Sequence, residues 1–136
     1  MSNMQLDTLR RIVQEINASV SLHDSLDIMV NHVAEAMHVD VCSIYLLDER
    51  NKRYVLMASK GLKPEAVGHV SLSVGEGLVG LVGKREEIVN LDNAPKHERF
   101  AYLPETGEEL FNSFLGVPVM YRRKVMGVLV VQNKEP

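Results

Sequence analysis

The sequence predicts an α+β fold in which a largely antiparallel sheet carries helices on its faces. Apolar residues recur at three- and four-residue spacing in the first third of the chain, which is the period of an amphipathic helix. After His38 the period changes to two, and three links between neighbouring strand-like segments resemble hairpins, which require antiparallel pairing. The 136 residues suit a single domain, which we expect to span residues 1–136.

Two helices are predicted before the first strand. Ser21 is a candidate N-cap for the second of them, with Asp24 three residues later as a weak capping-box partner. Each predicted helix carries an apolar stripe along one face. Such a stripe is more typical of a core or a helix-pair seam than of a binding groove. The first stripe consists of Leu6, Leu9, Ile12, Val13, Ile16 and Val20, and the second of Leu22, Leu26, Met29, Val30, Val33 and Met37.

The rest of the chain alternates between strands and turns. In the second strand, alternation predicts Tyr54, Leu56 and Ala58 on one face and Val55, Met57 and Ser59 on the other. A helix is expected after Gly75, and the tight turn Arg122-Arg123 joins the last two strands. The predicted strands are Val41 to Asp48, Arg53 to Lys60, His69 to Val74, Ile88 to Leu91, Ser113 to Tyr121 and Lys124 to Gln132.

Composition excludes several classes of protein. Charged residues of both signs make up 24% of the chain and the formal net charge is -3, so the basic excess of a nucleic-acid groove is missing. The apolar runs are far shorter than the roughly 20 residues that span a bilayer, and the N-terminus has no signal-peptide core. With a single cysteine, no disulfide framework can form. We therefore expect a cytoplasmic protein that binds neither nucleic acid nor membrane.

The segment Gly75-Glu76-Gly77-Leu78-Val79-Gly80 matches the G-x-G-x-x-G pattern of dinucleotide-binding loops. Its context argues against that function, because Glu76 would repel a pyrophosphate and no parallel βαβ unit surrounds it. We interpret the glycines as a strand-to-helix turn with unusual backbone angles, and Gly80 and Gly83 as positions of close helix packing. The helix N-terminus remains a candidate wall of a ligand pocket.

No catalytic residue, metal site or cofactor is predicted. The five histidines lack the i, i+4 spacing of a helical metal site, and Cys42 lies inside a strand without a recognisable base. A buried structural thiol is the favoured interpretation of Cys42. Neighbouring carboxylates such as Glu86 and Glu87 are typical of solvated surfaces, and enzymatic activity would have to be shown by turnover.

The long polar segment 92–112 exceeds the usual length of a connection between strands. Its first part, with residues of both charge signs followed by Phe100, suits a lid that orients a small ligand over a cleft. A solvated loop is an equally good interpretation of the same residues.

The sequence resembles the GAF domain family along nearly its whole length. The most similar members are the N-terminal GAF domains of the phosphoenolpyruvate-protein phosphotransferases of the nitrogen-related phosphotransferase system, which share stretches like Asp92-Asn-Ala-Pro-Lys-His97 and the pair Arg122-Arg123. Members that reduce methionine sulfoxide use several cysteines, and bilin-binding members attach the chromophore outside the first strand, so Cys42 supports neither activity. The stretches that carry the resemblance are Cys42-Ser-Ile-Tyr-Leu-Leu-Asp48, Gly75 to Gly83, Ile88-Val-Asn-Leu-Asp92, Phe114-Leu-Gly-Val-Pro-Val119 and Val125-Met-Gly-Val-Leu-Val130.

The resemblance implies N-terminal helices on one sheet face and a ligand cleft under the third helix and the long loop on the other. It also implies a longer multidomain parent that takes phosphate from phosphoenolpyruvate onto a histidine of its downstream catalytic domains. The expected effectors are glutamine or 2-oxoglutarate, with Lys96 pairing with a carboxylate and Asp92 with an ammonium group. The predicted ligand-binding residues are Tyr45, Ser59, Gly77, Leu78, Asn90, Asp92, Lys96, His97 and Phe100. The alternative function is a ligand-free homodimerisation module whose Leu6 to Val20 helix forms an intersubunit bundle.

Overall fold

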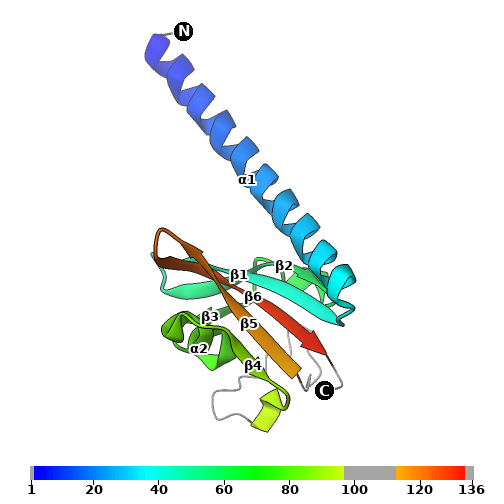
Figure 1. Cartoon of the computed structure of the whole chain (residues 1–136). Helices are drawn as coiled ribbons and strands as arrows, with labels where there is room; N and C mark the ends of the chain where they lie inside the picture. Colours follow the sequence, from blue (N-terminus) through cyan, green and yellow to red (C-terminus); the bar gives the residue numbers. More distant parts are fainter. Residues whose placement is uncertain (1, 97–112, 134–136) are drawn as a thin grey trace.

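The computed structural model describes residues 2–96 and 113–133. Its centre is one six-stranded sheet in the order β3-β2-β1-β6-β5-β4, and every neighbouring pair is antiparallel. The α+β prediction is therefore confirmed. Helices α1 and α2 lie on opposite faces of this sheet (Figure 1). The elements are α1 (Asn3–Met37), β1 (Val41–Asp48), β2 (Arg53–Lys60), η1 (Pro64–Ala66), β3 (Ser71–Ser73), α2 (Gly77–Arg85), β4 (Val89–Leu91), η2 (Ala94–Lys96), β5 (Ser113–Tyr121) and β6 (Lys124–Asn133).

Helix α1 is a single helix of 35 residues, so the prediction of two helices with a break at Ser21 is wrong. Its first turn is closed by a capping box, in which Ser2 Oγ accepts a hydrogen bond from the Gln5 amide at 3.2 Å. It ends at His38, which adopts a left-handed conformation with φ of 53°. Between these two caps the sequence contains neither glycine nor proline. The weak cap signal at Ser21 therefore does not interrupt the helix.

The two halves of α1 have different surroundings. In the C-terminal half, Leu26, Val30 and Ala34 are buried against β1, β2 and β6, with Cys42 and Ile44 among their neighbours. The N-terminal half projects away from the sheet, and residues 3–15 are all exposed (Figure 1). Only the second half of the helix is therefore fixed by burial of apolar surface within this chain.

A bulge in the β1–β2 ladder redirects part of β2. Ile44 is paired with Ala58, but the next residue, Tyr45, is paired with Leu56. Leu56 consequently lies in the cluster under α2, whereas Ala58 lies in the cluster under α1. The prediction that Leu56 and Ala58 share a face is wrong, because strict alternation fails where one strand carries an extra residue.

Both long hairpins end in tight turns. In the β1–β2 turn, the Asp48 carboxylate accepts hydrogen bonds from the backbone amides of Arg50 and Asn51, and Lys52 has a positive φ of 56°. The β5–β6 turn has positive φ at two successive residues, 50° at Arg122 and 67° at Arg123. Such turns match the twist of antiparallel strands, and Asn-Gly is their usual sequence.

Candidate functional site

The sheet face under α2 carries buried and half-buried polar side chains within an apolar surface. Tyr45 is 5% exposed and belongs to the main buried cluster on this side of the sheet. Ser59 lies beside Ser43 of the next strand, with their hydroxyl oxygens 2.8 Å apart. Gln132 of β6 is paired with Val41 and Phe114, which both belong to the same buried cluster. These four side chains form the floor of the candidate site.

Two floor residues, Ser43 and Gln132, were missed by sequence reasoning. They are the buried polar residues of the part that the structure describes, with exposed fractions of 0% and 6%. Ser43 lies between Cys42 and Ile44, which face α1, so alternation places Ser43 on the α2 side. For Ser43 the signal was available in the sequence, because a polar residue at an inward position of an apolar strand identifies such sites.

The glycines before and within α2 have conformational and packing functions, as the sequence analysis predicted. Gly75 and Gly77 adopt positive φ angles of 89° and 65°. A Cβ at Gly80 would overlap the Gly75 backbone, and a Cβ at Gly83 would overlap the phenol of Tyr54. The motif thus brings α2 close to its own turn and to β2.

The predicted wall residues Gly77 and Leu78 form the first turn of α2. Leu78 is buried in the cluster that also contains Tyr45. Glu76 precedes the helix, and its carboxylate accepts a hydrogen bond from the Ser73 amide at 3.0 Å. That carboxylate places negative charge beside the helix N-terminus, where a bound anion would otherwise be favoured.

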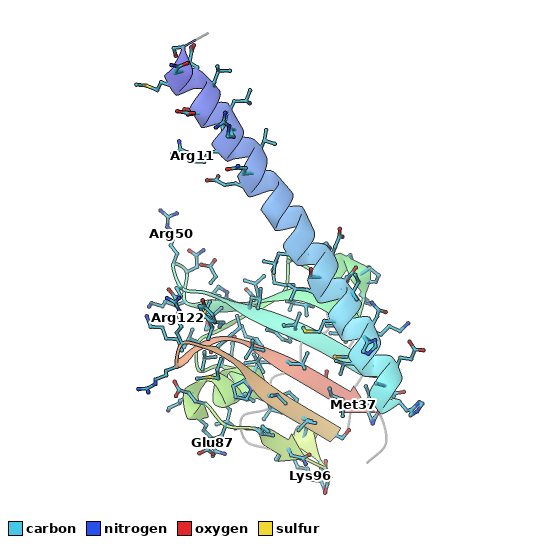
Figure 2. The ribbon with its side chains drawn as sticks, turned by 45° about the horizontal axis from the view of Figure 1, so that its top comes forward. Arg11, Met37, Arg50, Glu87, Lys96 and Arg122 are labelled. Atoms are coloured by element: carbon cyan, nitrogen blue, oxygen red, sulfur yellow. The ribbon has the colours of Figure 1, made fainter. Side chains whose placement is uncertain are left out.

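The predicted lid residues are only partly brought to the site. In β4, Val89 is buried and Leu91 packs against the cluster under α2, whereas Asn90 is exposed and its partner Leu115 packs on the α1 side. Asp92 and Lys96 are exposed, and Figure 2 shows Lys96 at the outer end of η2. His97 and Phe100 lie outside the described residues.

The titratable groups show the effect of burial. Cys42 is 0% exposed, which confirms the interpretation of a buried thiol, and this burial raises its pKa to about 11. The pKa of Tyr54 is raised by desolvation and, to a smaller extent, by the negative charge of Glu86.

Among residues 2–96 and 113–133, no three His, Cys, Asp or Glu side chains are grouped so that they could hold a metal ion. Within the same residues, no helix has the length and apolarity to cross a membrane.

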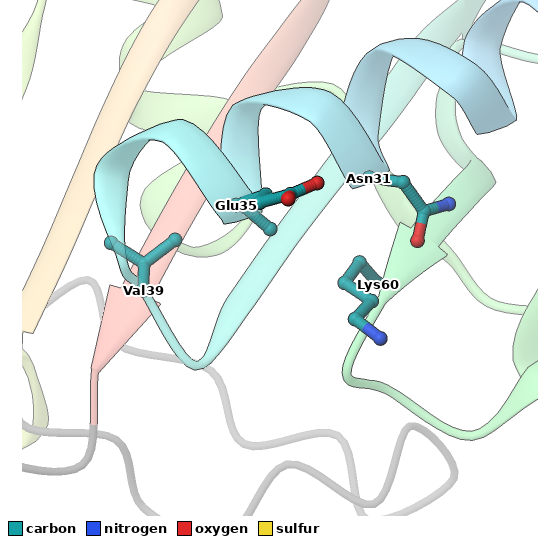
Figure 3. Close-up of a pocket in the computed structure, with 5 residues that line it drawn as sticks. Asn31, Glu35, Val39 and Lys60 are labelled. Atoms are coloured by element: carbon teal, nitrogen blue, oxygen red, sulfur yellow. The ribbon is translucent and has the colours of Figure 1, made fainter.

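A separate surface hollow of about 340 Å³ lies on the α1 side of the sheet. It is lined by Asn31, Ala34, Glu35, Val39 and Lys60, and in Figure 3 the Glu35 and Lys60 side chains extend from the helix and the strand that border it. None of the predicted ligand-binding residues lines this hollow. It is therefore distinct from the floor under α2.

An antiparallel sheet with a long N-terminal helix on one face and a short helix over a partly polar floor on the other defines a small α+β domain. The family model of the GAF domain matches residues 21–136, and the chain belongs to the GAF domain family.

One similar solved structure is the GAF domain from an Acinetobacter phosphoenolpyruvate-protein phosphotransferase. It is 85% identical, with a TM-score of 0.79, over 100% of this chain and 81% of that one. The GAF domain from a phosphoenolpyruvate-protein phosphotransferase of Coxiella burnetii is 43% identical over 98% of this chain and 81% of its own, with a TM-score of 0.81.

A curated relative from Escherichia coli (strain K12), described as phosphoenolpyruvate-dependent phosphotransferase system, is 45% identical over 120 residues. The match covers 88% of this chain and 16% of that relative. The chain thus corresponds to about one sixth of the length of that protein.

Proposed function

We propose that this chain is the regulatory, small-molecule-sensing domain of a phosphoenolpyruvate-protein phosphotransferase, and that it responds to glutamine or 2-oxoglutarate as signals of nitrogen status. The observation that carries the proposal is the 85% identity, over the whole chain, to a GAF domain of such an enzyme. In this proposal the parent is cytoplasmic, its downstream domains perform the phosphotransfer, and this domain needs no cofactor of its own.

The composition of the floor under α2 favours a small polar ligand. Tyr45, Ser43, Ser59 and Gln132 supply hydroxyl and amide groups within an otherwise apolar surface, which is the composition of small-molecule sites. Gly77 and Leu78 would form one wall. Asp92, Lys96, His97 and Phe100 would complete the site as a lid, whereas we leave Asn90 out because it lies toward the other face of the sheet.

In this proposal, the effect of ligand binding reaches α1 through strand β1 of the sheet. In β1, Tyr45 faces the proposed site while the preceding residue, Ile44, packs under α1. A ligand that favours one position of β1 would therefore also bias α1. The energetic coupling between the two faces is a consequence of this shared strand.

Titration of the purified domain with glutamine and 2-oxoglutarate, followed by calorimetry and thermal unfolding, tests this proposal. We expect saturable binding by one of the two, and a loss of about tenfold in affinity for Ser59→Ala because a half-buried hydroxyl of the proposed floor is removed. The matched control is Thr8→Ala, which also removes a hydroxyl but in the projecting half of α1. Absence of binding by both compounds at saturating concentration would overturn the sensing proposal.

Two charge substitutions distinguish the two effectors. Lys96→Gln is expected to weaken binding of either compound, because both carry a carboxylate. Asp92→Asn is expected to weaken glutamine alone, because only glutamine carries an ammonium group. Equal effects of Asp92→Asn on both compounds would contradict the assigned role of Asp92.

The second candidate function is homodimerisation through the projecting half of α1. Leu6, Leu9, Ile12 and Val13 are 45%, 53%, 46% and 47% exposed on this segment, although they are large apolar residues. Leu6, Leu9 and Val13 follow the three-four spacing of a coiled-coil seam. A second copy of the same helix would bury this stripe, and the two functions are compatible.

Sedimentation equilibrium tests the dimer. Leu9→Arg is expected to shift the protein to the monomer, since it places a charge in the seam. Ile28→Arg is the matched control, because Ile28 is 70% exposed on the half of α1 that packs against the sheet. A monomeric wild-type protein, or equal effects of both substitutions, would exclude a dimer formed by this stripe.

A further inference from the structure

Two hairpin tips lie side by side at one end of the sheet. Because β1 and β6 are antiparallel neighbours, with Leu46 paired with Gly127, the β1–β2 turn lies beside the β5–β6 turn. Figure 2 shows Arg50 and Arg122 projecting from this same end of the molecule. We define the tip surface by the six exposed residues Arg50, Lys52, Tyr121, Arg122, Arg123 and Lys124.

The tip surface concentrates positive charge in a chain whose formal net charge is -3. Its five cations are accompanied in the same two turns by two anions, Asp48 and Glu49. The Asp48 carboxylate is already used, since it accepts hydrogen bonds from two backbone amides and from the Asn51 side chain. Within residues 2–96 and 113–133, the guanidinium groups of Arg122 and Arg123 make no hydrogen bond or ion pair.

The backbone conformation of the β5–β6 turn is unfavourable for two arginines. Arg122 and Arg123 both have positive φ angles, 50° and 67°, in a turn for which Asn-Gly is the usual choice. Side chains with a Cβ are disfavoured in this conformation. An outlier of this kind is a reason to look for a function of the side chains that it displays.

Apolar side chains surround the charged ones. Met120, Tyr121 and Met126 are 42%, 61% and 40% exposed. The Arg122 guanidinium lies over the Tyr121 ring, 5.2 Å from its centroid, in an attractive cation–π arrangement. Arg, Tyr and Met are the residue types enriched in protein–protein interfaces, and Arg and Tyr are common among their energetic anchors.

We propose that the tip surface binds an acidic protein segment that also carries apolar side chains. Carboxylates of the partner pair with Arg122 and Arg123, while its apolar groups pack on Met120, Tyr121 and Met126. Charge complementarity selects an acidic partner, and the exposed methionines and tyrosine select a protein. A nucleic acid is disfavoured because its phosphate backbone would leave the exposed apolar side chains of this surface uncovered.

The test uses a short fluorescent peptide in which Glu alternates with Leu, and its counterpart with Gln in place of Glu. Anisotropy titration of the wild-type domain is expected to show binding of the Glu peptide that weakens with salt, and little binding of the Gln peptide. The double variant Arg122→Asn/Arg123→Gly should lose about tenfold or more in affinity. Its unfolding temperature should be equal or higher, because the new residues suit the turn.

Lys60→Gln/Lys63→Gln is the matched control, since it removes the same charge from exposed positions at the other end of β2. It is expected to change the affinity less than about twofold, as is usual for distant surface charges. Equal losses in both double variants, or equal binding of both peptides, would overturn the proposal. Tighter binding of a single-stranded oligonucleotide or of phosphatidylserine vesicles through the same arginines would also overturn it, because the partner would then not be a protein.

Discussion

At the scale of single residues, the contact between Gly83 and Tyr54 fixes how closely α2 approaches the sheet. A Cβ at position 83 would overlap the Tyr54 hydroxyl, which is itself buried. Gly83→Ala is therefore expected to destabilise the domain by about 1–3 kcal/mol, as overpacking does. In a double-mutant cycle by urea denaturation, Tyr54→Phe should recover part of this loss because the hydroxyl is removed. Lys84→Ala, at an exposed position of the same helix, is the control, and a similar loss there would contradict the steric explanation.

The buried thiol of Cys42 predicts a decrease in stability at alkaline pH. Burial raises its pKa from the ordinary value of 9.0 to about 11, so the unfolded chain releases this proton first as the pH rises. The stability is complete below about pH 9 and falls between about 9 and 11. Tyr54, whose pKa is also raised, adds a decrease at higher pH. Denaturation of the wild type and Cys42→Ala across this range should give a shallower decrease for the variant, and equal slopes would contradict the assignment.

The candidate site was only partly predictable from single residues. Tyr45, Ser59 and Leu78 were predicted and lie on the α2 side of the sheet. Gln132 could not be placed without knowing that β6 pairs with β1 and β5, since its burial depends on those neighbours. Asn90 was placed by its position at a strand end, but the alternation within β4 points it away from the floor. Burial that arises from pairing is a property of the sheet and is only weakly encoded in a local segment.

At the scale of elements, the two halves of α1 should respond differently to the same substitution. Val30 is completely buried, and Val30→Ala should cost about 2 kcal/mol from lost burial and the resulting cavity. Val13 is 47% exposed on the projecting half, so Val13→Ala should cost less than about 0.5 kcal/mol in the monomer. Urea denaturation at low protein concentration measures both values. A large effect of Val13→Ala under those conditions would mean that the projecting half is packed within one chain.

The strands were more predictable than the helices. Val41–Asp48, Arg53–Lys60 and Ser113–Tyr121 have the predicted bounds, because period-two patterns flanked by turn residues are strong local signals. The predicted break at Ser21 was wrong, because an N-cap residue type begins a new helix only where the preceding helix has already ended. The bulge opposite Ile44 and Tyr45 was not predictable, since it depends on the register between two strands.

At the scale of the whole molecule, strand β1 contacts both the proposed effector site and the helix α1, whose projecting half carries the proposed dimer seam. Tyr45 faces the floor under α2, and Ile44 packs under the helix whose far half carries the apolar stripe. If ligand binding and dimerisation are coupled through this strand, linkage requires the coupling to be reciprocal.

The coupling can be measured in both directions. Saturating effector should change the dimer dissociation constant, and the monomeric Leu9→Arg variant should bind the effector with an affinity changed by the same factor per site, in the range of about 5- to 150-fold. Sedimentation equilibrium with and without effector gives the first value, and calorimetry on wild type and variant gives the second. Ile28→Arg, on the half of α1 that stays on the sheet, should leave both values unchanged. A dimer dissociation constant that is the same with and without saturating effector would contradict the coupling between the two sites.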